Sequence, residues 1–193
     1  MKTIGLVVVV AVVTAAVTTA VTRRYTAPAS APALQTPNAT VQEIMEGLVD
    51  PSSKVIFESV GVVSNASGTT ELAPQSPEQW AHVERSAMML AEAANLLALD
   101  GRHVERPGAE PDAGHESSPE LPPEQIEARI NSDRAAWLKH ADALRAIATH
   151  ARDVATTRNV QGLFDVGAEL DVACENCHQA YWYNAPDGVR VRR

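Results

Sequence analysis

Two cysteines and a histidine near the C-terminus are the residues of this chain with the clearest chemistry. They lie in the run Cys174-Glu175-Asn176-Cys177-His178, which has the spacing C-x-x-C-H and holds both cysteines of the 193-residue chain. This spacing is typical of covalent haem attachment, in which two thiols form thioethers with the porphyrin and the next imidazole binds the iron. The run therefore predicts one haem c on Cys174 and Cys177, with His178 as an axial iron ligand.

Two other kinds of site use a C-x-x-C pair. A thioredoxin-type redox pair follows a strand in a βαβ unit, and nothing in this sequence reads as a parallel sheet. Half of a structural zinc site would need two more ligands at close spacing. The other histidines form no such second pair: His82, His103, His115, His140 and His150. We expect neither site.

Helices must position these residues, because alanine is abundant and aromatic residues make up only 4% of the chain. Thr40 and Glu43 form a capping box that begins a first helix. We expect Pro51 to kink this helix, which then resumes as far as Val60. Residues 60–72 indicate either a small hairpin or a long loop.

A second helix is predicted from Ser76, with Gln79 completing its capping box, and Gly101 should end it. Residues 102–123 are rich in proline, glycine and glutamate, which indicates an exposed connection. We expect one long third helix from about Pro123. Its apolar series has a spacing of seven residues: Ile130, Trp137, Leu144 and Ala151.

The fourth predicted helix begins after Asn159 and carries the C-x-x-C-H run. Its apolar residues alternate spacings of three and four up to Tyr181, so both cysteines fall on the apolar seam. Four consecutive helices with narrow seams predict an all-α fold, an antiparallel four-helix bundle over residues 40–185 with the haem on its last helix.

With this motif in its last helix, the chain resembles the class II c-type cytochromes, the cytochrome c′ family with its cytochrome c-556-like members. The resemblance covers about residues 40–183 and depends mostly on residues 173–183, ACENCHQAYWY. It implies haem attachment at Cys174 and Cys177, His178 as the proximal ligand, and a homodimer through the first two helices. The chain has Glu175 and Trp182 in regions where family members commonly carry basic residues.

A second axial ligand cannot come from downstream, because the fifteen residues after His178 contain no Met, His, Cys or Lys. Met45 is the leading candidate, since related six-coordinate proteins supply a methionine from this region of the first helix. Its alternative role is ordinary core packing. Met88, Met89 and His140 are further candidates. Tyr181 is expected to cover the haem edge.

The N-terminal residues 1–31 are predicted to be a signal peptide or a membrane anchor, because Lys2 precedes an uncharged apolar stretch, Ile4 to Val21. Residues 32–39 read as a linker and residues 186–193 as a basic tail. Because haem attachment to this motif is expected outside the cytoplasm, we expect a periplasmic protein that contacts the membrane only through residues 1–31.

The net charge is −8, and residues 32–193 hold 13 basic and 24 acidic residues, a net charge of −11. Such a domain should repel nucleic acid and meet a redox partner with a basic surface. We expect a periplasmic electron carrier that cycles between ferric and ferrous iron. The alternative is a five-coordinate haem protein that binds nitric oxide or carbon monoxide. We do not expect an enzyme, since only His140 with Asp133 offers a distal acid–base pair.

Overall fold

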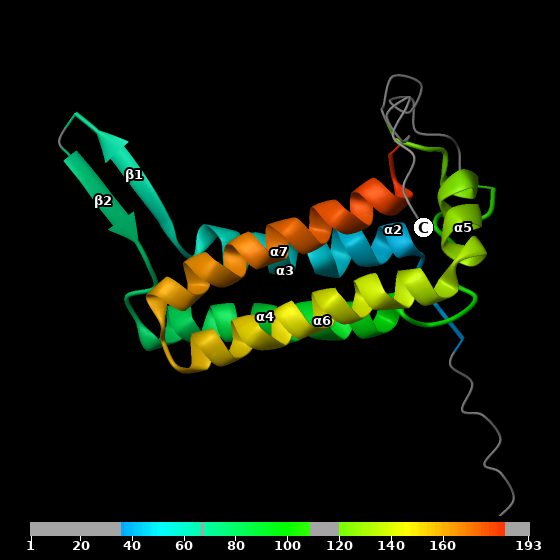
Figure 1. Cartoon of the computed structure of the whole chain (residues 1–193). Coiled ribbons are helices and arrows are strands. Elements are labelled where there is room, and N and C mark those ends of the chain that lie inside the picture. Colours follow the sequence, from blue (N-terminus) through cyan, green and yellow to red (C-terminus); the bar gives the residue numbers. More distant parts are fainter. Residues whose placement is uncertain (1–35, 67, 109–119, 184–193) are drawn as a thin grey trace, which may run out of the picture. The chain divides into compact units, whose positions relative to one another are not determined.

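The computed structural model describes residues 36–66, 68–108 and 120–183. The chain divides into two units, Met1–Thr36 and Pro37–Arg193, and every element described below belongs to the second. This unit is mostly helical, with one two-stranded hairpin (Figure 1). The predicted signal or anchor segment, half of the linker and the basic tail lie outside the described residues. Within the described residues, none of the helices combines the length and the apolar character needed to cross a bilayer.

The first helical stretch consists of three consecutive elements. They are α2 (Val41–Ile44), a π-helical turn η1 (Met45–Val49) and α3 (Asp50–Glu58). The capping box is confirmed, because the Glu43 amide donates to Thr40 Oγ1 at 3.1 Å and the Thr40 amide donates to Glu43 Oε2 at 2.9 Å. The stretch ends at Glu58, so the prediction that it continues to Val60 is wrong.

The π-helical turn lies directly before Pro51, where a kink was predicted. In this turn the Asp50 amide donates to the Met45 carbonyl. A proline ring inside an α-helix clashes with the carbonyl four residues earlier and provides no amide hydrogen, and the wider π turn accommodates both effects. The same turn spans the five-residue gap between the buried side chains of Ile44 and Val49. The helix therefore widens at this point and continues past the proline.

Strands β1 (Gly61–Asn65) and β2 (Gly68–Leu72) form the hairpin, which decides between the two alternatives for residues 60–72. They pair antiparallel, with Gly61 opposite Leu72. Helix α4 (Pro77–Leu97) follows and has the predicted capping box at Ser76. It ends before Gly101, which has a φ of +72°, a backbone conformation that glycine adopts without a steric penalty.

The connection after α4 is not simply exposed, so that part of the prediction is wrong. Val104 and Leu121, at its two ends, are only 4% and 3% exposed. The Val41 amide also donates to the His103 carbonyl at 2.9 Å. Apolar side chains thus tie both described ends of this polar segment to the core, while residues 109–119 lie outside the description.

The single long third helix is also a wrong prediction, because two helices take its place. Helix α5 (Pro123–Ser132) and helix α6 (Arg134–Thr156) are separated by Asp133, which has φ −140° and ψ 72°. The Asp133 carboxylate accepts a hydrogen bond from the Ala136 amide at 3.0 Å. A side chain that caps a new helix competes with continuation of the old one. The apolar series still holds across the break, since Ile130 and Trp137 are both buried.

Helix α7 (Val160–Tyr181) is the last helix, and Asn159 caps it by accepting from the Gly162 amide at 3.0 Å. Helix α4 packs against α3 and α6, and α7 packs against α6 and α3. The α2–η1–α3 stretch, α4, α6 and α7 therefore enclose one core. Its largest fully buried side chains come from all of these stretches except α6: Ile44, Ile56, Leu90, Leu163, Val166 and Leu170.

Candidate haem site

The C-x-x-C-H run lies in the second half of α7. Cys174, Cys177 and His178 are all half-buried, and both cysteines are free thiols packed against the core. Because residues three and four apart lie on one side of a helix, the two thiols and the imidazole occupy neighbouring positions. The helical period therefore brings the three predicted haem-binding residues together.

These three residues line one small apolar cavity. Its volume is about 30 Å³, and its walls come from η1, α4, α6 and α7. The lining residues are Met45, Val49, Leu97, Trp137, His140, Ala141, Leu144, Ala173, Cys174, Cys177, His178 and Trp182. Two cysteines, a methionine and two histidines thus line a space whose other walls are mostly apolar residues.

Packing along α7 is uneven, and the change falls at the start of the motif. Leu163, Val166 and Leu170 in the first half have no exposed surface. From Asp171 to Ala180 no residue is buried, and burial returns only at Tyr181. The half of the helix that carries the cysteines is thus the half that protein side chains do not cover fully.

The residue types that line the cavity fit a covalent haem. The cavity itself is too small to hold a haem unless the surrounding helices move apart. Two thiols and an imidazole at this spacing are the attachment set of a c-type haem. Ligand sites usually measure about 300–1,000 Å³, far more than the 30 Å³ found here. The half-covered part of α7 and the facing η1 turn would have to separate to admit a porphyrin between them.

Burial controls the reactivity of the two thiols. Burial, followed by the nearby charge of Asp171, raises the pKa of Cys174. Burial, followed by the neighbouring Cys174, raises the pKa of Cys177 to about 12. Both groups are therefore neutral thiols at neutral pH, and thiolate character is low in the folded chain.

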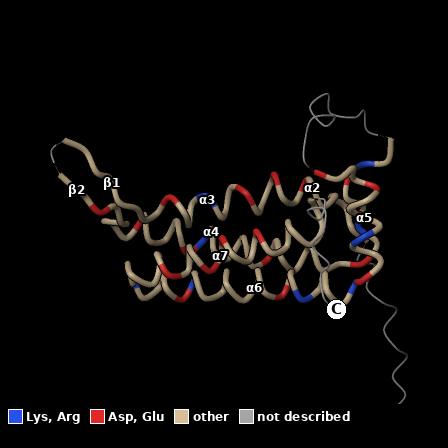
Figure 2. The backbone as a smooth tube through the Cα atoms, turned by 45° about the horizontal axis from the view of Figure 1, so that its top comes forward, with Lys and Arg blue, Asp and Glu red and all other residues tan. Residues whose placement is uncertain are grey.

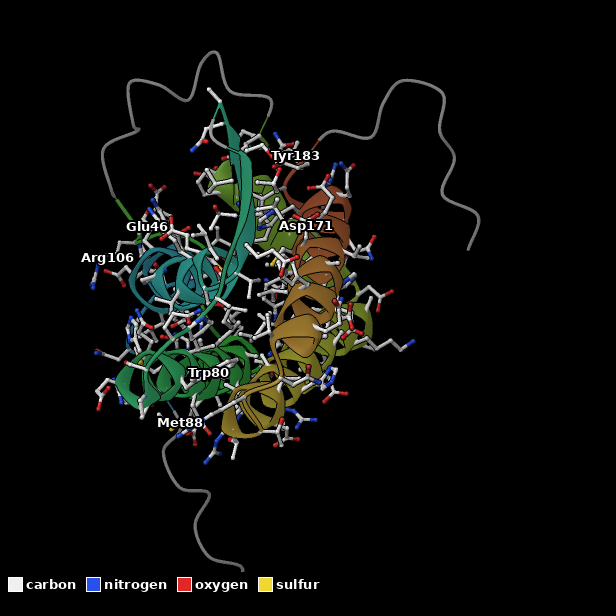
Figure 3. All side chains as sticks on the ribbon, turned by 90° about the vertical axis from the view of Figure 1, so that its left-hand side faces the viewer. Glu46, Trp80, Met88, Arg106, Asp171 and Tyr183 are labelled. Carbon is white, nitrogen blue, oxygen red and sulfur yellow. The ribbon has the colours of Figure 1, made fainter. Side chains whose placement is uncertain are left out.

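Of the proposed second axial ligands, Met45 and His140 line the cavity. Met45 is half-buried at the start of the π turn and lines the same space as His178. Met88 and Met89 are 41% and 42% exposed on α4, and Met88 points away from the helices (Figure 3). They cannot serve as ligands in this arrangement, because Leu90 occupies the inner side of α4. Whether Met45 binds iron stays a prediction.

Tyr181 lies in a buried aromatic group next to the cavity. Only 4% of it is exposed, and its ring makes edge contacts with Trp137 and His140, at centroid distances of 5.2 and 5.6 Å. Burial, with smaller effects of Cys177 and Asp133, raises the pKa of Tyr181 to about 12. Burial also lowers the pKa of His140. Tyr181 thus packs beside the motif, and its contact with a haem edge stays a prediction.

His178 has two aromatic neighbours, Trp182 and Tyr183, at centroid distances of 5.8 and 6.4 Å. The Leu121 amide donates to the Trp182 carbonyl at 2.7 Å, and Arg129 Nη1 donates to the Tyr183 carbonyl at 2.8 Å. Sequence reasoning missed Leu121 and Arg129. The sequence offered one indication, an isolated leucine in a polar segment, and this does not show that the Leu121 amide binds Trp182.

The surroundings of the motif differ from those of the two alternative sites. Helix α6, not a strand, precedes α7, and in the described ranges the two strands form only the hairpin. In the same ranges, no group of three or more His, Cys, Asp or Glu side chains is arranged to hold a metal ion. Comparisons of this chain with protein-family models, with curated proteins and with solved structures found no match. Its function is therefore inferred from the motif and its surroundings.

Proposed function

We propose that this chain is an exported c-type cytochrome that carries one covalent haem and transfers electrons in the periplasm. In this proposal the α2–η1–α3 stretch, α4, α6 and α7 form an antiparallel four-helix bundle of the kind found in the cytochrome c′ family. One observation carries the proposal. The C-x-x-C-H run lies on the half of α7 that protein side chains leave incompletely covered, facing an apolar cavity.

The residues of the cavity have separate roles. Cys174 and Cys177 would hold the porphyrin, and His178 would bind the iron. A bound haem c supplies one-electron chemistry between ferric and ferrous iron. Val49, Leu97 and Leu144 exclude water from the cavity and lower its dielectric constant, which is one of the ways in which a protein sets a haem potential.

Met45 decides between an electron carrier and the second candidate function. As a sixth ligand, its thioether would keep the iron closed to external ligands, which suits a carrier. If Met45 only packs, the apolar lining would leave the iron open to nitric oxide or carbon monoxide. The half-buried position of Met45 in the cavity wall favours the carrier, because Met45 and the motif line the same cavity.

The proposal includes no enzymatic reaction. Peroxidase chemistry would need an acid–base pair near the iron, and the sequence offers only His140 with Asp133. The Asp133 carboxylate caps α6 through the Ala136 amide. This hydrogen bond gives Asp133 a structural role at the start of α6.

A basic redox partner suits the charge of the chain, whose net value over residues 32–193 is −11. Among the described residues, acidic positions are spread along the helices instead of gathering on one element (Figure 2). Long-range attraction would therefore steer a basic partner towards the whole domain. A homodimer, and a location in the periplasm or at the inner membrane through residues 1–31, belong to the same proposal.

The test is expression in a bacterial host that exports and matures c-type cytochromes, followed by intact-mass analysis. The expected product carries the mass of one haem, and Cys174→Ala combined with Cys177→Ala lacks it. Unmodified parent protein from a host that matures a control cytochrome would refute the proposal.

Met45→Leu then separates carrier from gas binder. We expect the ferric parent to show the weak far-red band of thioether ligation, and the variant to lose this band and bind carbon monoxide faster when reduced. Met88→Leu is the matched control, since Met88 is exposed on α4. Equal carbon monoxide binding in the parent and in Met45→Leu would favour the gas-binding function.

A further inference from the structure

The end of α7 carries two aromatic rings beside His178, which we call the aromatic cap, Trp182 and Tyr183. The imidazole and the Trp182 ring are inclined by 56° at a centroid distance of 5.8 Å, and the imidazole and the Tyr183 ring by 77° at 6.4 Å. Both cap residues are half-buried. The imidazole therefore has two aromatic neighbours before any cofactor is considered.

The aromatic cap is held from outside its own helix. The Leu121 amide donates to the Trp182 carbonyl at 2.7 Å, and Arg129 Nη1 donates to the Tyr183 carbonyl at 2.8 Å. Glu120 and Tyr183 form an isolated antiparallel β-bridge. The last carbonyls of a helix have no partner within the helix, and such ends fray. Here two donors distant in sequence bind carbonyls just beyond the helix end.

Leu121 anchors this arrangement in the core. Its side chain is 3% exposed, in the same apolar cluster that Cys174 and Cys177 pack against. The partly buried Arg129 extends from α5, on which Ile126 and Ile130 are also buried. The cap is thus tied to the buried Leu121 and to helix α5, and displacing it would break two hydrogen bonds together.

We propose that the aromatic cap, positioned by Leu121 and Arg129, retains His178 on the haem iron. This inference rests on the proposed function. An imidazole leaves a metal by swinging its side chain away from it, and the rings of Trp182 and Tyr183 restrict that rotation. Half-buried aromatic neighbours also favour the packed rotamer over an exposed one. The cap acts through the imidazole and is a positioning device.

Nitric oxide provides the sharpest test, because it weakens the bond on the opposite side of a haem iron and releases loosely held imidazoles. The haem-loaded, reduced protein is mixed with nitric oxide and its electron paramagnetic resonance spectrum is recorded. An imidazole that stays bound adds nitrogen superhyperfine splitting, and a released one does not. We expect the parent protein to keep the splitting of His178.

Two variants weaken the cap and two more serve as comparisons. Trp182→Leu removes one ring, and Arg129→Ala removes the donor to the Tyr183 carbonyl. Arg129→Lys keeps a positive donor and should restore most of the retention. Arg102→Ala is the matched control, because this arginine also donates to backbone carbonyls, those of Leu96 and Ala39, outside α7.

We expect Arg129→Ala to raise the ratio of released to retained His178 about tenfold, the change in an equilibrium constant that loss of one charged hydrogen bond brings. Arg102→Ala should leave the ratio unchanged. The inference is overturned if the parent releases His178 fully, or if Trp182→Leu and Arg129→Ala both match the parent. Intact mass, measured before nitric oxide is added, keeps the two proposals apart, because a missing haem removes the basis of both.

Discussion

Leu170→Ala tests whether the first half of α7 is the packed half of that helix. Leu170 has no exposed surface and lies one turn before Cys174, and it is not among the residues that line the cavity. Val172, two positions later, is 58% exposed. Val172→Ala is therefore the matched control on the same helix.

The expected magnitude follows from burial. Replacing a fully buried leucine with alanine costs about 2–5 kcal/mol, from lost apolar transfer and from the cavity left behind. Removing methyl groups from an exposed valine changes stability by about 0.5 kcal/mol or less. In a domain of this size about 1 kcal/mol corresponds to roughly 2–4 °C in the melting temperature. Leu170→Ala should therefore melt roughly 4–20 °C below the parent protein.

The assay is thermal and urea unfolding of the haem-loaded protein, followed by far-ultraviolet circular dichroism. The urea midpoint should fall without a change in slope, because the native surface is otherwise the same. The visible spectrum should match that of the parent, since Leu170 does not line the cavity. Equal losses in Leu170→Ala and Val172→Ala would refute the reasoning, because burial would then not distinguish the two positions.

Two further predictions concern the site. Cys174→Ala with Cys177→Ala should abolish cooperative unfolding, because the second half of α7 would lack the haem that completes its packing; a sharp calorimetric transition at the parent's temperature would contradict this. Alkaline stability should depend on Tyr181, whose pKa is raised from 10.0 to about 12 by burial. A tyrosine whose pKa is higher in the folded than in the unfolded state stabilises the folded protein at pH values below the unfolded-state pKa. This stabilisation is lost as the pH rises from the unfolded-state pKa, about 10, to the folded-state pKa, about 12. Urea midpoints of Tyr181→Phe should therefore fall less over this interval than those of the parent, and identical slopes would argue against this role.

Features that depend on neighbours in sequence were predictable. Thr40 with Glu43 and Ser76 with Gln79 place side-chain oxygens within reach of nearby amides, and both predicted capping boxes are confirmed. The fourth helix begins after Asn159, as predicted, and the Asn159 side chain caps it. The hairpin was one of two stated alternatives. The C-x-x-C-H spacing and the helical period place two thiols and an imidazole on one side of a helix. Short-range hydrogen bonds and fixed helix geometry are enough for these features.

Features that depend on competition between distant parts of the chain were not predictable. The apolar spacing allows one continuous third helix, but the Asp133 side chain caps the start of a new helix instead, so the predicted helix is broken at this residue. The π turn at Met45 forms because the buried side chains before and after Pro51 must face one core. Leu121 reaches Trp182 only when the two ends of the chain's second half meet. The residue types and their spacing therefore specified the chemistry on α7. Packing between helices determined which side chains surround it, because which side chains are buried depends on all the helices of the core and not on any one segment.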